Sequence, residues 1–143
     1  MSETVMICTD LGKISDQVIS KGVELAVKLK APIRLVHVLT GDNATPHATP
    51  NASDTTAKEM IQAQNKLERA KERLRDSGCE FTAVTPKGDV IDELKKEIAD
   101  QDPYVLVMGA LNNTALRHVV SGSVAGSVLN STNCQVLLVP EAK

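Results

Sequence analysis

Apolar residues fall into five short runs along the chain, separated by polar or mixed segments. The runs cover residues 5–9, 33–39, 79–85, 104–108 and 134–139. Most are rich in Val, Ile and Leu, a pattern typical of strands buried on both faces of a parallel sheet. The third run instead alternates Phe81 and Ala83 with Glu80 and Thr82 and is followed by Pro86. A strand of that kind is predicted to lie at a sheet edge.

Between these runs the apolar residues recur at helical spacing. Ser15 can cap a helix that ends before Pro32. Gly88 and Asp89 begin another helix, which stops before Pro103. The apolar face of the first helix consists of Val18, Ile19, Gly22, Val23, Ala26 and Leu29.

The longest predicted helix follows a polar stretch, residues 40–53, that should form a surface loop. Residues 56–59 fit a capping box, the helix runs to about Ser77, and Gly78 is its expected C-terminal cap. Its second face mixes acidic and basic residues and is expected to be solvated. Its apolar face contains Met60, Ile61, Leu67, Ala70 and Leu74.

The composition bounds the architecture and the class of protein. A chain of 143 residues is one domain, residues 1–143, and 42% apolar with only 1% aromatic residues predicts an aliphatic core. The net charge is −2 without a basic cluster, so nucleic acid and anionic membranes are not expected as partners. No run approaches the roughly 18 apolar residues of a spanning helix, and no basic–apolar leader opens the chain, which predicts a cytoplasmic protein.

The few metal-ligating residue types do not suggest a metal site. Cys8, Cys79 and Cys134 are far apart and odd in number, so buried free thiols inside strands are expected. His37, within the second run, is expected to be a packed or edge histidine rather than a ligand.

The fourth run leads into the segment with the most specific pattern. The strand ends at Met108, Gly109 follows as a turn, and a polar loop leads to Gly122 and Ser123. Apolar residues at helical spacing then predict a helix that starts at these two residues. Free N–H groups at a helix N-terminus suit a phosphate, which Gly122 would admit closely and Ser123 could contact. A simple cap is the alternative that spacing alone leaves open.

The spacing Gly109-x2-Asn112-x9-Gly122-Ser123 resembles the nucleotide-binding motif of the universal stress protein family. That motif is Gly-x2-Gly-x9-Gly followed by Ser or Thr, so only Asn112 departs from it. Residues 5–10, ending in Thr9-Asp10, resemble the family's first strand, and residues 135–140 resemble its last. The resemblance therefore covers nearly the whole chain.

Five strands alternating with four helices predict an α/β fold, a single open five-stranded parallel sheet, doubly wound, with helices on both faces. The resemblance implies the strand order 3-2-1-4-5. In that order the winding direction reverses between strands 1 and 4, which opens a crevice beyond their ends. Thr9-Asp10 would form one wall of it and residues 109–123 the other.

The resemblance also implies which residues bind an adenine nucleotide (ATP, ADP or AMP). Asp10 would hydrogen-bond the ribose or the base, and Val38 and Met108 would pack near the base. The phosphates would be held by Gly109, Asn112, Gly122, Ser123 and Val124. For Thr9 the alternative to a ligand contact is a strand-end hydroxyl that hydrogen-bonds to the backbone. For Asp10 the alternative is a cap or turn carboxylate after the strand.

The departure at Asn112 bears on the ligand rather than on the fold. Asn tolerates a left-handed backbone, but its side chain occupies space that glycine leaves to a phosphate. The alternative is therefore a family member that does not bind a nucleotide. It would act as a dimeric protein-interaction module with an unidentified partner. Whether Mg²⁺ accompanies the nucleotide stays open.

The sequence lacks the residues that other activities on related folds require. A response-regulator receiver needs an acidic pair after the first strand, where this chain has the single acid Asp10, and a phosphorylated Asp after the third, where it has Pro86-Lys87-Gly88. No catalytic constellation can be assigned, so at most a weak ATPase activity is expected. The last strand, from Gln135 to Val139, would lie at a sheet edge, and both its unpaired backbone groups and the resemblance predict a homodimer through it.

Overall fold

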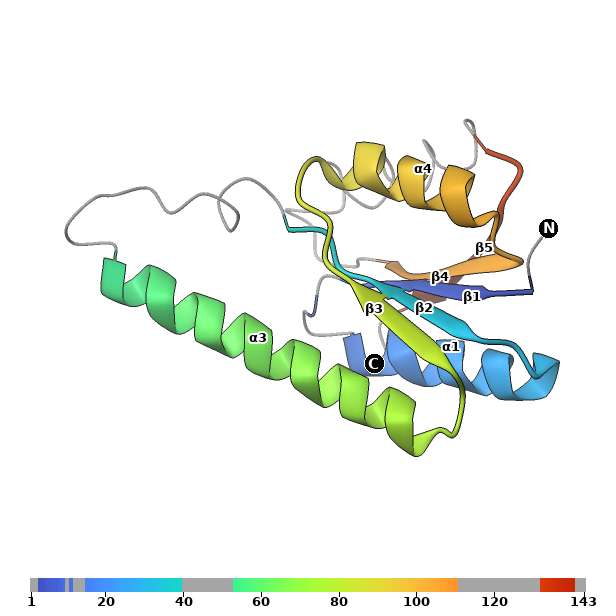
Figure 1. Cartoon of the computed structure of the whole chain (residues 1–143), viewed down its shortest axis with the longest axis horizontal. Helices are drawn as coiled ribbons and strands as arrows, with labels where there is room; N and C mark the ends of the chain where they lie inside the picture. Colours follow the sequence, from blue (N-terminus) through green and yellow to red (C-terminus); the bar gives the residue numbers. More distant parts are fainter. Residues whose placement is uncertain (1–2, 10, 12–14, 40–52, 111–131, 141–143) are drawn as a thin grey trace.

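The computed structural model describes residues 3–9, 11, 15–39, 53–110 and 132–140. Its centre is a five-stranded parallel sheet in the order β3-β2-β1-β4-β5, as predicted (Figure 1). The strands are β1 (Val5–Cys8), β2 (Ile33–Val36), β3 (Phe81–Val84), β4 (Val105–Ala110) and β5 (Gln135–Pro140). Strands β3 and β5 are the edges, which confirms both edge predictions.

Helices cover both faces of the sheet (Figure 1). Helices α1 (Ser15–Leu29) and α3 (Ser53–Asp76) lie on one face, and α4 (Val90–Gln101) lies on the other. The fold class is therefore the predicted doubly wound α/β sheet. The fourth predicted helix, which would begin at residues 122–123, falls outside the described residues.

The core consists of two aliphatic layers, one on each side of the sheet. The layer under α1 and α3 includes Val18, Ile19 and Leu74 packed on alternate strand residues. The layer under α4 includes Leu94 and Ile98 packed on the other strand residues, such as Met6 and Leu106. Because β1 and β4 contribute to both layers, their runs are apolar without alternation, as is typical of central parallel strands.

Local sequence chemistry sets most of the helix ends. Gly78 has φ +78° after α3, the left-handed conformation of a C-terminal cap, as predicted. The Asp89 side chain accepts a hydrogen bond from the Asp92 N–H and caps α4, and Asp102 ends that helix in a left-handed conformation before Pro103.

Several boundaries differ from the predictions. Helix α3 begins at Ser53, ahead of the predicted capping box, because Ser53 and Asp54 themselves are residue types that start helices. Ile61 is 58% exposed rather than on an apolar face, since this end of α3 extends past the sheet (Figure 1). Leu29 is also exposed, at the last turn of α1, where Lys30 (φ +53°) redirects the chain.

Two further predictions, on the end of the fourth strand and on the cysteines, need correction. Gly109 does not end the fourth strand, because β4 continues through Ala110 and Gly109 pairs with Val139 of β5. None of the three cysteines forms a disulfide, but each is only half-buried, whereas buried thiols were predicted. Cys79 and Cys134 lie just before β3 and β5 rather than within them.

Candidate functional site

The strand order places a change of winding direction between β1 and β4. From β1 the chain proceeds to β2 and β3 on one side, whereas β4 and β5 lie on the other. Cys8 and Met108 form the last pair of the β1–β4 ladder, and Thr9 and Gly109 are the residues that follow this pair. In open α/β sheets such a switch point is where ligands bind. The described parts of the two predicted walls are thus brought together.

The remaining residues of the predicted site are not among those described. Asp10, Asn112, Gly122, Ser123 and Val124 lie in the segments that the structure leaves out. Their assignment to a ligand stays a prediction from the sequence.

Thr9 is buried, and its hydroxyl is engaged within the protein. Its Oγ1 accepts a hydrogen bond from the Leu11 N–H at 3.0 Å and donates one to Oγ of Ser15 at 2.8 Å. Thr9 and Ser15 are 6% and 7% exposed. This geometry matches the second role considered for Thr9, a strand-end hydroxyl that holds the turn and the start of α1.

Leu11 completes that turn in an unusual backbone conformation. Its φ is +61°, in the left-handed region that non-glycine residues seldom adopt, and its side chain is buried in the core below α1. Burial of the side chain offsets the cost of the backbone conformation, which is of the order of 1 kcal/mol or more. The residues on both sides of Asp10 are therefore held in place.

His37 is buried and packed, as predicted, and has a specific partner. Its Nδ1 lies 2.9 Å from the carbonyl oxygen of Thr9. Its backbone N–H donates to the carbonyl of Val84 at 3.1 Å. His37 thus connects the carboxyl ends of β1, β2 and β3. The sequence indicated its burial, but the hydrogen bond depends on the register of two strands and has no signal in the sequence.

Val38 and Met108 form the apolar part of the predicted site. Both are 8% exposed and belong to the same buried cluster, next to Leu94 and Ile98 of α4. The segment carrying Val38 is fixed beyond the end of β2, since the Leu39 N–H donates to the Pro86 carbonyl at 2.8 Å. The role of both residues beside a ligand base remains a prediction.

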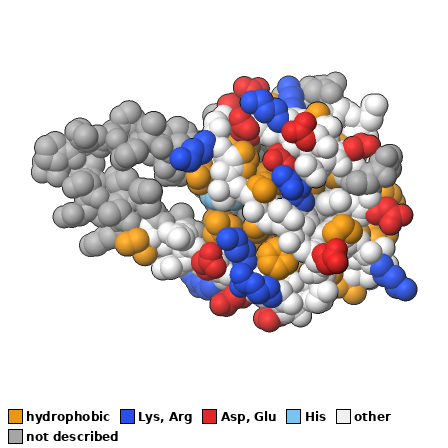
Figure 2. Space-filling view, in the orientation of Figure 1, with side chains coloured by type: hydrophobic (Ala, Val, Ile, Leu, Met, Phe, Trp, Pro, Cys, Tyr) orange, Lys and Arg blue, Asp and Glu red, His pale blue; other side chains and the backbone are white. Residues whose placement is uncertain are grey.

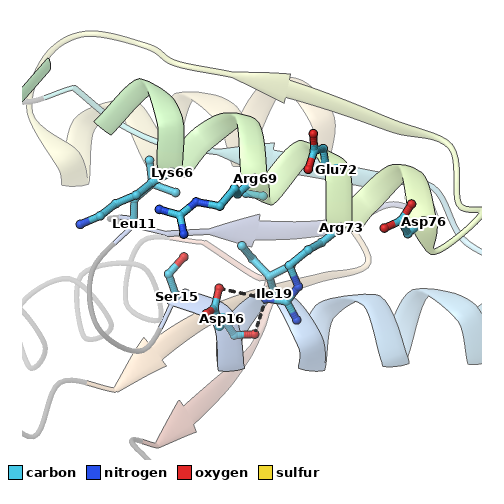
Figure 3. A pocket seen from close by; sticks show the side chains of 10 residues that line it. Leu11, Ser15, Asp16, Ile19, Lys66, Arg69, Glu72, Arg73 and Asp76 are labelled. Atoms are coloured by element: carbon cyan, nitrogen blue, oxygen red, sulfur yellow. Dashed lines mark hydrogen bonds and ion pairs between the residues drawn. The ribbon is translucent and has the colours of Figure 1, made fainter. Parts of the chain in front are cut away.

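A groove of about 420 Å³ between α1 and α3 begins beside this turn, at Leu11 and Ser15. Arg73 of α3 crosses it and donates to the carbonyl and the carboxylate of Asp16, at 3.0 and 3.1 Å (Figure 3). Arg73 also donates to the hydroxyl of Ser20. Most charged residues of α3 are exposed, as predicted. Arg73 is only partly exposed, because its side chain bonds to residues of α1.

The charges of that groove are arranged unevenly. Lys66 and Arg69 lie at the end near Leu11 and Ser15, whereas Glu72 and Asp76 lie farther along α3 (Figure 3). All four side chains belong to exposed residues. Solvent screens such charges strongly. The bonds from Arg73 to Asp16 and Ser20 join the start of α1 to α3.

Further observations concern the surface charges, the cysteines and the helices of the described residues. On the described part of the face in Figure 2, basic and acidic side chains are interspersed rather than gathered by sign. Among the described residues, no group of three or more His, Cys, Asp and Glu could hold a metal ion. Burial raises the pKa of the Cys134 thiol, which disfavours the reactive thiolate. None of the described helices is long and apolar enough to cross a membrane.

Comparison with known proteins gives one consistent result. The family model described as "Universal stress protein family" matches residues 1–140. A universal stress protein of Methanothermobacter thermautotrophicus is 28% identical over 134 residues, which cover 90% of each chain.

Solved structures show the same fold at lower sequence identity. The structure of MJ0577 of Methanocaldococcus jannaschii has a TM-score of 0.73 at 22% identity and covers 100% of this chain and 99% of its own. A universal stress protein in complex with cAMP has a TM-score of 0.67 at 20% identity, with 97% of each chain covered. One from Archaeoglobus fulgidus in complex with dAMP has a TM-score of 0.66 at 20% identity, with 96% and 97% covered.

Proposed function

The chain belongs to the universal stress protein family, and on that premise we propose that it binds an adenine nucleotide, ATP, ADP or AMP, in the crevice beyond the carboxyl ends of β1 and β4. The observation that carries the proposal is the reversal of winding at these two adjacent strands, whose last residue pair, Cys8 and Met108, is followed by Thr9 and Gly109. The structures of two relatives with this fold are complexes with cAMP and with dAMP, which share the adenine base and a phosphate.

The described residues fit this ligand in part. Val38 and Met108 would pack near the base, and the turn at Thr9 and Leu11 is fixed by hydrogen bonds and burial. Asp10 would then bond the ribose or base, and the phosphates would lie toward Gly109, Asn112, Gly122, Ser123 and Val124. Regulation through binding, rather than catalysis, follows from a site without an assigned acid, base or nucleophile.

Thermal unfolding in the presence of ATP, ADP, AMP and GTP tests the proposal. A ligand present at one hundred times its Kd adds about 2.7 kcal/mol of stability, which raises the midpoint by several degrees in a domain of this size. The adenine nucleotides should produce the shift and GTP should not. Midpoints unchanged by millimolar adenine nucleotides, with calorimetry also flat, would refute nucleotide binding.

A second candidate function is a dimeric protein-interaction module that needs no nucleotide. The observation that favours it is the exposure of Leu137 and Leu138, 40% and 43%, on opposite faces of the edge strand β5. Edge strands with unpaired backbone groups and apolar side chains readily pair with another chain. A groove of about 370 Å³ flanks this strand, lined by residues 137–140 of β5 and by Lys21, Glu24, Leu25 and Lys28 of α1.

The two candidates differ in one measurable respect. If the nucleotide is part of the function, its affinity should respond to changes at Asp10 whatever the oligomeric state. If the chain acts only as a dimer, changes in β5 should alter assembly while nucleotides have no effect on stability.

A further inference from the structure

A groove of about 590 Å³ lies beside the last two turns of α4, at the amino ends of β4 and β5. One wall is formed by the segment 132–135, which leads into β5, and residues 103 and 104 line the groove between α4 and β4. The other wall belongs to α4 and its C-terminal cap, with residues spaced i, i+3, i+4 and i+7, which share one face of a helix. These residues are Lys95, Ile98, Ala99 and Asp102.

This groove is separate from the crevice proposed for the nucleotide. The crevice lies beyond the carboxyl ends of β1 and β4, whereas the groove adjoins the amino end of β4. At the usual rise of a strand, the six residues of β4 hold the two about 17 Å apart. A ligand of the groove is therefore independent of nucleotide binding.

The lining combines an apolar floor with a few polar groups. Ile98 and Pro103 are buried, and Tyr104, the only tyrosine of the chain, is 38% exposed. The side-chain amide of Gln135 donates to the Tyr104 carbonyl at 2.9 Å and ties the starts of β4 and β5 together. A concave volume of several hundred Å³ with this kind of lining is typical of small-molecule sites.

One end of the groove carries a positive charge at Lys95. This residue is partly buried, and within the described part of the chain no ion pair or hydrogen bond engages its ammonium group. The neighbouring Lys96 is instead well exposed and pairs with Glu93 at 3.2 Å. Because a partly buried charge without a counter-ion is unfavourable, the Lys95 end favours an anionic group.

The other end carries a negative charge at Asp102. Burial and, to a smaller extent, the Asp102 carboxylate raise the pKa of the Cys134 thiol, so the charge of Asp102 acts across the groove on the opposite wall. The last turn of α4 has no basic residue. The partial negative charge of the helix C-terminus therefore adds to that of the carboxylate, and this end favours a cationic group.

We propose that this groove binds a short zwitterionic peptide, two or three residues long with free termini. Its carboxylate lies at Lys95, its amino group at Asp102, and an apolar side chain between them packs on Ile98 and Tyr104. Lys95 and Asp102 are seven residues apart, about 10.5 Å at the helical rise. An extended tripeptide spans up to about 10 Å, whereas a single amino acid carries both charges on one carbon and reaches only one end.

Three tripeptides test the charge at each end. Alanyl-leucyl-alanine has both charges, its N-acetylated form keeps only the carboxylate, and its C-amidated form keeps only the amino group. In NMR titrations of the labelled protein, we expect the free tripeptide to bind with a Kd of about 0.1–1 mM. Each blocked form should bind about fivefold more weakly. Backbone amides of residues 95–104 and 132–135 should shift, and those of Thr9 and Leu11 should not.

Two substitutions assign the termini to their partners. Lys95→Gln should remove the penalty for C-amidation to within about 1.5-fold and leave the penalty for N-acetylation, and Asp102→Asn should do the reverse. Asn suits position 102, where φ is +44°, because it tolerates the left-handed conformation. Lys96→Gln and Asp100→Asn are the matched controls, since they remove neighbouring charges that do not line the groove. Both controls should behave as the unmodified protein does.

The outcomes that would overturn the proposal are distinct. Millimolar tripeptide that shifts no amide along the groove refutes a ligand of this class. Equal affinities for the free and both blocked tripeptides refute the two charge contacts. A penalty that Lys95→Gln and Lys96→Gln change alike, with circular dichroism unaltered, refutes the role of Lys95, and the pair Asp102→Asn and Asp100→Asn decides for Asp102 in the same way.

Discussion

Nε of Arg34 in β2 lies 2.7 Å from Oε2 of Glu97 in α4, although 63 residues separate them in the chain. A second contact joins Nη2 to Oε1 at 3.4 Å, so the pair is close to bidentate. The side chains are only 19% and 16% exposed. The bond therefore attaches α4 to the sheet on the face that also buries Val38 and Met108.

Removing one partner of this pair should destabilise the domain. Arg34→Met leaves the Glu97 carboxylate half-buried without its partner, and we expect a loss of about 1–3 kcal/mol in the free energy of unfolding. Glu97→Met should cost a similar amount, and the double variant should lose less than the sum. Denaturant unfolding measures all three, with Lys21→Met, which removes an exposed ion pair, as control. Additive losses would show that the pair is not coupled.

A second stability prediction concerns the contact between α1 and the central strand. A Cβ on Gly22 would overlap Cδ1 and Cγ1 of Ile7, so the helix approaches β1 as closely as it does because Gly22 has no side chain. Gly22→Ala should gain helix propensity, about 1 kcal/mol, but lose more through overpacking, which typically costs 1–3 kcal/mol. We expect a net loss in thermal unfolding experiments. Combining it with Ile7→Val should restore part of the stability by returning the space.

The architecture was predictable because its determinants are local or periodic. The uninterrupted run at Tyr104–Met108 indicated a central strand, and the alternation around Phe81 indicated an edge. Gly78 and Asp89 carry the chemistry of helix ends, and both act as predicted. The sequence therefore predicted the layers and the switch point, once the family resemblance had supplied the strand order.

The details that failed depend on partners distant in sequence. Gly109 was predicted to form a turn, but it pairs with Val139 of β5, and β4 therefore continues past it. Ile61 fits an apolar stripe, yet no sheet lies beneath that end of α3. The hydrogen bond from His37 to Thr9 requires the register of β1 and β2, which no local pattern in the sequence contains.

The predicted homodimer through β5 can be tested at its exposed leucines. Leu137→Lys places a charge on the apolar surface of the edge strand, and a charge there opposes pairing with a second copy. We expect the population to shift toward monomer in sedimentation experiments. Ile61→Lys, an exposed apolar residue on α3, is the matched control and should leave assembly unchanged. A monomeric unmodified protein at micromolar concentration would exclude the dimer.

Asp10 should matter for affinity but not for folding. Asp10→Ala removes the carboxylate expected to bond the ribose or base, and charge-assisted hydrogen bonds contribute about 1.5–3 kcal/mol. Nucleotide affinity measured by titration calorimetry should therefore fall roughly ten- to hundredfold. Thr9→Val is an informative companion, because it breaks the bonds to Leu11 and Ser15 and should lower stability as well as affinity. Affinity unchanged in Asp10→Ala would remove Asp10 from the site.

Asn112 decides how closely this chain follows the nucleotide-binding members of its family. The spacing from Gly109 to Gly122 and Ser123 is kept, and only the middle glycine of the motif is replaced. If Asn112 crowds a working phosphate loop, Asn112→Gly should tighten ATP more than adenosine, because only the phosphates pass that position. The substitution should also lower stability by about 0.5–1 kcal/mol, since glycine gives the unfolded chain more freedom.

Titration of both proteins with ATP and with adenosine separates the possible outcomes, and adenosine is the internal control because it lacks phosphates. A tighter ATP complex with unchanged adenosine affinity places Asn112 beside the phosphates and supports the motif as a whole. Tighter adenosine binding without tighter ATP binding would contradict that placement. If the variant binds neither ligand while keeping a cooperative unfolding transition, the loop does not serve a nucleotide, and the dimeric interaction module becomes the better description of this chain.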